Sequence, residues 1–262
     1  MIDGLEPLLK TMTKTLISGE GMTVLQAQLG EWDNLNHLLV CENTGEACII
    51  DPWSGKFWQQ LCHENGWKLN SVLLTHSHWD HSRGVGELFE DGAEIWVHEL
   101  ESERGWNGPD TNRWSHAEFT HVSFQLGQLE FEIHCTPGHT PGHVTIIGNG
   151  VVISGDCLFL GRCGRADLFG GDFAKMHHSL IHLKKVIKDL PGDWLVLPGH
   201  QYELQDGSRP TYLTTARLLR ENSALQAAGN EEKFMALEFL AFDDSLAEKA
   251  RRQKAKSGLD TL

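Results

Sequence analysis

The sequence lacks any apolar run approaching the roughly 20 consecutive residues that are needed to cross a bilayer. Residues 1–21 contain two lysines but no apolar core segment, so we expect no secretory signal. Apolar residues make up 40% and charged residues 22% of the 262 positions, which is typical of a chain that buries a core. We therefore expect a cytoplasmic protein without a membrane partner.

Basic residues are also scarce: 22 Lys and Arg stand against 36 Asp and Glu, a formal net charge of −14. Because proteins bind nucleic acids mainly through cationic side chains on the phosphates, this balance argues against a nucleic-acid partner. The cysteines are scattered and include no CxxC pair, which favours reduced thiols over a disulfide framework. They are Cys41, Cys48, Cys62, Cys135, Cys157 and Cys163.

Short β-rich runs recur up to about residue 205, with amphipathic stretches between some of them, which indicates a mixed α/β fold. Gly148-Asn149-Gly150 predicts a tight hairpin turn, because Asn and Gly tolerate a positive φ. Strands are expected at residues 23–25, 37–40, 47–50, 72–74, 94–97, 129–135, 144–147, 151–154 and 194–197, and helices at 57–65, 85–90 and 173–190.

Beyond residue 205 helix formers replace the β pattern. We expect one helix to start at Ser208-Arg209-Pro210, a second over Glu231 to Leu240 and a third capped by Asp243-Asp244-Ser245. Residues 101–121 are typical of a long loop or insertion. The chain then divides into an N-terminal extension (1–21), a main domain (22–205) and a helical C-terminal segment (206–262) packed on it.

Polar clusters follow four of the predicted strands. His76-x-His78-x-Asp80-His81 comes after the apolar run that ends at Leu74, and the other three clusters end in His139, Asp156 and His200. Side chains at strand ends project from a rigid scaffold into one region, so we expect the four clusters to meet.

Imidazole nitrogens and carboxylate oxygens are the ligands that Zn²⁺ takes in catalytic sites, where a position stays open for water. His76, His78 and His139 can hold one ion, while Asp80, His81 and His200 can hold a second. Asp156 can bridge the two. The sequence therefore predicts two divalent ions, with zinc as the first choice and iron or manganese as alternatives.

Each residue also has an ordinary structural interpretation. His139 and His200 alone would more often be surface or core histidines, but both occur in a Pro-Gly-His sequence after a strand. Asp156 alone could be a turn residue or a helix cap. His143 could support the ligands or simply belong to a turn. A complete but idle metal-binding scaffold is also compatible with these residues, although a structural zinc needs only four ligands.

Together the HxHxDH motif, His139, Asp156 and His200 resemble the metallo-β-lactamase superfamily over roughly residues 22–205, which would make that segment the catalytic domain. The resemblance implies an αββα sandwich with the metals at one edge, to which the expected C-terminal helical tail is added. Thr75-His76-Ser77-His78-Trp79-Asp80-His81 and the segment from Gly155-Asp156 to Arg165 resemble glyoxalase II, the hydroxyacylglutathione hydrolases, and their persulfide dioxygenase relatives.

The likeness to glyoxalase II implies that Arg165 and Tyr202 contact a glutathione moiety, with Arg251 and Lys254 meeting its glycine carboxylate. The tail pair is more typical of a solvated basic helix end, which the helix dipole favours. The chain departs from glyoxalase II after Arg165, where a second glutathione-contacting Tyr is missing, and its helical tail is shorter.

We therefore expect a metal-dependent hydrolase of a small-molecule substrate, such as a glutathione thioester, that uses a metal-bridging hydroxide oriented by Asp80. One alternative is a mononuclear Fe(II) persulfide dioxygenase, for which the resemblance assigns His76, His139 and Asp156 as ligands. Another is hydrolysis of a different ester or a lactone. Nothing in the sequence indicates an oligomeric state.

Overall fold

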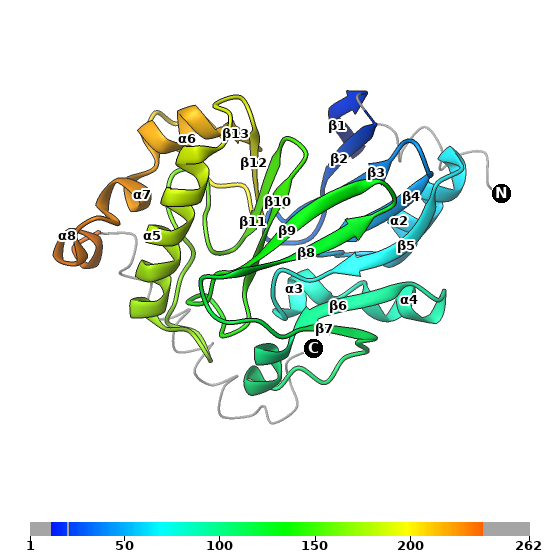
Figure 1. Cartoon of the computed structure of the whole chain (residues 1–262), viewed down its shortest axis with the longest axis horizontal. Helices are drawn as coiled ribbons and strands as arrows, with labels where there is room; N and C mark the ends of the chain where they lie inside the picture. The colour runs from blue at the N-terminus through cyan, green and yellow to red at the C-terminus, as the bar shows by residue number, and fades with distance from the viewer. Residues whose placement is uncertain (1–11, 20, 238–262) are drawn as a thin grey trace.

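A computed structural model describes residues 12–19 and 21–237 and contains two β-sheets packed face to face. The first sheet has seven strands in sequence order (Figure 1). Strands β1 to β4 pair antiparallel, and β4 to β7 pair parallel. They are β1 (Thr13–Gly19), β2 (Met22–Gln28), β3 (Leu35–Cys41), β4 (Glu46–Ile50), β5 (Lys68–Leu73), β6 (Glu94–His98) and β7 (Asn112–Trp114).

The second sheet has six strands in the order β13-β12-β11-β10-β9-β8. All its neighbours pair antiparallel except β11 and β12, which are parallel. The predicted turn at Gly148-Asn149-Gly150 joins β10 to β11, with Asn149 at a φ of 49°. The strands are β8 (His121–Leu126), β9 (Leu129–Cys135), β10 (Val144–Gly148), β11 (Val151–Gly155), β12 (Leu195–Pro198) and β13 (Leu213–Thr214).

Helices cover the outer face of each sheet, which gives the four layers of the expected αββα sandwich (Figure 1). On the first sheet lie α2 (Gly55–Asn65), α3 (Trp79–Ser82) and α4 (Val85–Glu90), followed by the 3₁₀ helix η1 (Glu99–Arg104) after β6. On the second lie α5 (Phe173–Asp189), α6 (Thr215–Glu221), α7 (Ser223–Ala227) and α8 (Glu231–Met235).

Three apolar clusters hold these layers together. Between the sheets, Val24, Leu39 and Leu73 meet Phe131 and Ile153. This central layer arises because strands buried on both faces are mostly apolar, as the fully buried β3 is apart from Asn36 and His37. The other two clusters join each sheet to its own helices, and Phe234 in α8 lies fully buried in one of them.

The predictions for regular elements were mostly confirmed, because these segments carry clear periodicity and caps. The helix expected at 173–190 is α5, whose N-cap Asp172 accepts a hydrogen bond from the Lys175 backbone. The expected helix at 85–90 is α4. Part of the proposed N-terminal extension forms β1, the edge strand of the first sheet.

Two predictions were wrong. No helix starts at Ser208: the chain first adds β13 to β12, and α6 begins at Thr215 with Thr214 as its cap. Residues 101–121 are not simply a loop either, since they contain part of η1 and the whole of β7, which pairs with β6. The expected cap at Asp243-Asp244-Ser245 lies outside the described residues.

Within residues 12–19 and 21–237, none of the helices combines the length and apolar character that a bilayer span requires. All six cysteines are buried and unpaired, as expected from their scattered positions.

Gly138 fixes α5 against the loop that carries His139. Its φ is 137°, and a Cβ there would lie 2.4 Å from the Met176 backbone in α5. We therefore expect Gly138→Ala to lower the free energy of unfolding by about 2–3 kcal/mol, through backbone strain and overpacking. Urea unfolding measures this. The control is Gly86→Ala in α4, where no described atom lies within 4 Å, and which should change stability by less than about 1 kcal/mol. Equal stabilities of the two variants would contradict this explanation.

Candidate metal centre

The four polar clusters meet at one edge of the sandwich. His76 follows β5, His139 follows β9, Asp156 follows β11 and His200 follows β12. Backbone hydrogen bonds tie these loops together: Val144 donates to the Thr75 carbonyl, and Gly199 donates to that of Gly155. The ends of these strands are neighbours in the two packed sheets. Side chains as far apart in the sequence as His76 and His200, which are separated by 124 positions, therefore lie close together.

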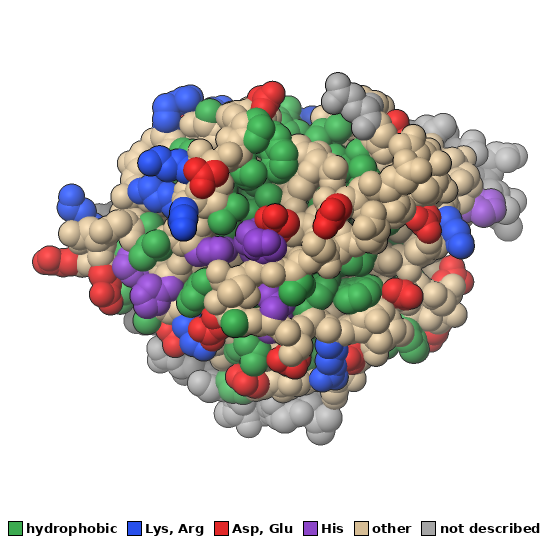
Figure 2. Space-filling model, in the orientation of Figure 1, with side chains coloured by type: hydrophobic (Ala, Val, Ile, Leu, Met, Phe, Trp, Pro, Cys, Tyr) green, Lys and Arg blue, Asp and Glu red, His purple; other side chains and the backbone are tan. Residues whose placement is uncertain are grey.

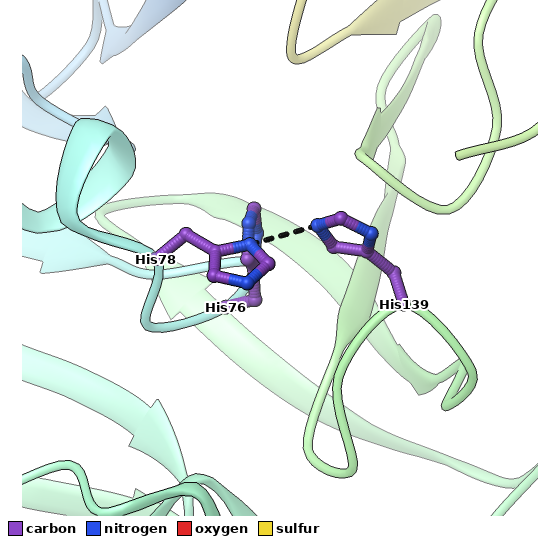
Figure 3. A group of neighbouring side chains, drawn as sticks. All are labelled: His76, His78 and His139. Atoms are coloured by element: carbon purple, nitrogen blue, oxygen red, sulfur yellow. Dashed lines mark hydrogen bonds between the residues drawn. The ribbon is translucent and has the colours of Figure 1, made fainter. Parts of the chain in front are cut away.

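The first group consists of His76, His78 and His139, whose candidate ligand atoms all lie within 4.8 Å of one another. The His78 Nδ1 and His139 Nε2 atoms are 2.8 Å apart. Figure 3 shows the rings of His76 and His78 approaching that of His139 from the opposite side of the site. All three rings are buried.

The second group consists of Asp80, His81 and His200, which also lie within 4.8 Å of one another. The Nε2 atoms of both histidines are 3.3 Å from the same Asp80 oxygen, Oδ2. Asp80 and His81 belong to α3, whose single turn places their side chains beside His200. The His81 ring also borders the first group, with its centroid 4.2 Å from that of His76.

Asp156 lies between the two groups. Its Oδ2 is 3.6 Å from His139 Nε2 and 3.3 Å from His200 Nε2, while its Oδ1 is 3.5 Å from His81 Nε2. One carboxylate therefore faces histidines of both groups, the arrangement that a bridging ligand requires.

Four of the histidines have their other ring nitrogen fixed. Nδ1 meets Thr75 Oγ1 in His76, Asp51 Oδ2 in His81, the Arg165 carbonyl in His139 and the Trp32 carbonyl in His200, at distances of 2.6–3.0 Å. Such bonds set the ring orientation and leave Nε2 directed into the centre, as outer partners do in metal sites.

The donor set fits divalent cations. Among the described residues, His76 Nε2 and Asp156 Oδ1 are buried without a hydrogen-bond partner, which is costly unless something else binds them. Burial, reinforced by His81, His78 and His139, holds the pKa of His76 well below its usual value, so its ring is neutral and can donate a lone pair. Burial likewise lowers the pKa of His78.

The second group attracts positive charge. Burial opposes ionisation of Asp80 and Asp156, but His81 and His200 hold the pKa of both carboxyls well below the usual range. Burial alone would lower the pKa of His200, yet Asp156 and Asp80 raise it to about 10. The carboxylates thus require positive charge here, supplied by protons on the imidazoles or by cations that replace them.

A family profile described as the metallo-beta-lactamase superfamily matches residues 31–200, which include all seven of these side chains. The chain belongs to the metallo-beta-lactamase superfamily. Its members named hydroxyacylglutathione hydrolase are similar to this chain. The hydroxyacylglutathione hydrolase of Idiomarina loihiensis is 26% identical over 86% of this chain and 88% of its own length. The hydroxyacylglutathione hydrolase of Xanthomonas euvesicatoria is 33% identical over 70% of this chain and 68% of its own length.

Solved structures are similar as well. ETHE1 from Myxococcus xanthus superposes with a TM-score of 0.67 at 27% identity, over 87% of this chain and 96% of its own. TTHA1623, solved in a di-iron-bound form, superposes with a TM-score of 0.57 at 26% identity, over 75% of this chain and 98% of its own. The protein is thus a glyoxalase II-like enzyme of the superfamily.

Three supporting residues escaped the sequence analysis. Asp51, after β4, accepts hydrogen bonds from the Thr75 backbone and hydroxyl as well as meeting His81. Asn34 donates to Asp80 Oδ2 at 2.8 Å. Asp51 could have been found, because it also follows an apolar strand. Asn34 carries no such signal, since it precedes β3 and reaches Asp80 only because β3, β4 and β5 lie side by side in the first sheet.

Glu101 is the third residue that was missed. It is fully buried, accepts from the backbone of Ser77 in the HxHxDH loop, and accepts from Gly142 in the His139 loop. The segment around residue 101 therefore connects the two loops that carry the first group. Its position in an expected loop concealed this role.

His143 supports the centre. Its Nε2 accepts from the backbone N–H groups of Asp156 and Cys157, at 3.1 and 3.2 Å, and its Nδ1 meets Thr136 Oγ1. Because Nε2 is an acceptor here, its lone pair is already used. His143 therefore orients the Asp156 turn.

The residues expected to contact the substrate differ in position and in partners. Tyr202 lies beside the centre, 42% exposed, with its ring centroid 6.3 Å from that of His200. The Arg165 guanidinium forms a two-pronged ion pair with Asp167 at 2.7 and 2.8 Å. Arg251 and Lys254 lie outside the described residues.

Trp79 of the motif belongs to an aromatic cluster next to the centre. Its ring centroid is 5.1 Å from that of Trp53 and 6.1 Å from that of Trp32, which is 57% exposed. The Arg83 guanidinium lies over the Trp53 ring at 5.0 Å. These rings form an apolar wall close to Asp80 and His81.

Asp156→Ala should reduce the metal content of both groups, because one carboxylate faces both of them. We expect the purified variant to hold less than half of the wild-type metal per chain, measured by elemental analysis after dialysis against metal-free buffer. Asp189→Ala, at an exposed site on α5, is the control and should match wild type. If Asp156→Ala retained nearly all of its metal, this result would contradict the bridging role of Asp156.

Proposed function

We propose that the protein is a binuclear metallohydrolase that cleaves a thioester, with a hydroxyacylglutathione as the substrate class. The observation that carries the proposal is the pair of three-donor groups sharing Asp156. The similarity to hydroxyacylglutathione hydrolases over most of the chain supports the substrate class. Zinc is the first choice of metal, and TTHA1623 in its di-iron form keeps iron as an option.

His76, His78 and His139 would hold one divalent cation, and Asp80, His81 and His200 would hold a second, with Asp156 shared between them. Such cations would lower the pKa of water toward neutrality and polarise a carbonyl oxygen. Other residues of the chain orient these metal-facing side chains. Asn34 holds Asp80 through Oδ2, and Asp51 holds His81 through Nδ1. Because these groups are buried, bulk water screens their charges little, which strengthens their effect on an attacking water.

Tyr202 is the substrate contact best supported by its position. Burial, together with Asp156 and Asp80, raises the pKa of Tyr202 to about 12, so the phenol stays protonated and can donate a hydrogen bond at neutral pH. Arg165 is already paired with Asp167, so a substrate carboxylate would have to compete with Asp167. We therefore assign more of the substrate contact to Tyr202 than to Arg165.

The persulfide dioxygenase alternative uses His76, His139 and Asp156 around one Fe(II), the two-histidine, one-carboxylate set of many oxygenases. These residues do converge, since His139 lies 3.6 Å from Asp156 and its ring is 4.8 Å from that of His76. The second group, however, would then have no function in the reaction.

The two reactions can be separated by metal removal and reloading. We expect a chelator to abolish thiol release from S-lactoylglutathione, and two equivalents of Zn²⁺ per chain to restore it. Oxygen consumption with glutathione persulfide should stay at background in the zinc-loaded and iron-loaded protein. Oxygen uptake at one iron per chain, without thioester cleavage, would instead establish the dioxygenase. If neither reaction occurs while two metals bind, the glutathione thioester is the wrong substrate class.

Tyr202→Phe should raise KM for S-lactoylglutathione about 2–10-fold, the worth of one hydrogen bond, and leave kcat nearly unchanged. Tyr212→Phe is the matched control, because Tyr212 is the only other tyrosine and packs near Lys14. Steady-state kinetics of the zinc-loaded proteins give both constants. An unchanged KM for Tyr202→Phe would show that the phenol does not contact the substrate.

A further inference from the structure

A second histidine cluster lies on the outer face of the second sheet, apart from the catalytic centre. His121 in β8 and His134 in β9 are directly opposite each other in the strand register. Glu132 lies two positions before His134, so its side chain projects from the same face. Figure 2 shows histidine side chains gathered on the face of the molecule where α5 lies beside these strands.

The side chains of this cluster converge. The candidate ligand atoms of His121, Glu132 and His134 all lie within 4.8 Å of one another. His134 Nε2 is 2.9 Å from one Glu132 oxygen, and His121 Nε2 is 3.6 Å from the other. Two imidazole nitrogens and a carboxylate are the donors that zinc-like cations take.

His134 is held as metal-binding histidines are. It is 2% exposed, and its Nδ1 lies 3.0 Å from Nε2 of His182 in α5. If Nδ1 donates its proton to His182, the lone pair of His134 Nε2 points at Glu132 and His121. An outer partner of this kind fixes the tautomer of a ligand, and its loss typically weakens metal binding about 10–100-fold.

The charge state of the His134 and His182 rings is suitable. Burial lowers the pKa of His134 to about 4 against the opposing effect of Glu132, and burial lowers the pKa of His182 as well. Both rings are therefore neutral near pH 7 and can offer lone pairs. His121 and Glu132 have side chains that are 49% and 48% exposed, so water can complete the coordination of an ion from the solvent side.

We propose that His121, Glu132 and His134 form a peripheral binding site for a divalent transition-metal cation such as Zn²⁺, with His182 as the positioning residue. The ion joins β8 to β9, and the His134–His182 bond connects it to α5. Because β9 leads into the His139 loop and α5 packs on Gly138, the ion lies beside the scaffold of the catalytic centre without contributing to it.

The number of zinc ions bound per chain tests this proposal. Holoprotein with a loaded catalytic centre is dialysed against buffered free Zn²⁺ near pH 7.5, and bound zinc is measured per chain. We expect wild type and the control His63→Ala, an exposed histidine on α2, to bind one equivalent more than His121→Ala or Glu132→Ala. Thioester hydrolysis should be the same in all four proteins. Equal zinc content in all four would overturn the site.

The role of His182 has its own test. His182→Ala should weaken binding of the additional zinc at least about 10-fold, and His182→Gln, whose amide oxygen can accept from His134 Nδ1, should restore most of the affinity. Far-UV circular dichroism and urea unfolding show whether the variants remain folded. Identical zinc affinity in His182→Ala and wild type would contradict the positioning role.

Discussion

Charge compensation in a buried corner is the constraint on which the centre depends. Asp80 and Asp156 are each less than one-tenth exposed and carry negative charge that burial penalises. They can remain ionised only because histidines from separate segments surround them. The fold must therefore hold these loops at fixed distances, and much of the remaining structure serves that purpose.

The outer layer of polar residues shows how the constraint is met. Asp51, Asn34 and the Arg165 carbonyl each hold one member of the centre, and Glu101 joins the HxHxDH loop to the His139 loop. Most of these contacts cross between segments that are far apart in the sequence. Losing one leaves a buried polar group unpaired, which is why such supporting residues matter almost as much as the ligands.

The substrate side is built differently from the centre. Tyr202 and the Trp32, Trp53 and Trp79 rings lie at its border and are partly exposed, whereas the metal-facing groups are buried. A shared centre with variable surroundings is how one fold hosts several reactions. In this chain the Arg165 guanidinium, expected to contact the substrate, is paired with Asp167.

The sequence alone determined the ligand types and most of the elements. The HxHxDH motif contains so many potential metal ligands that it predicts a metal site by itself. Local periodicity and backbone preference predict α4, α5 and the turn at Gly148-Asn149-Gly150. Tertiary structure decided what depends on distant partners: the role of His143, the contacts of Asn34 and Glu101, the pairing of β13 and the convergence of His121 with His134. These features depend on strand pairing within each sheet and on contacts between segments that are distant in the sequence, which no local pattern encodes.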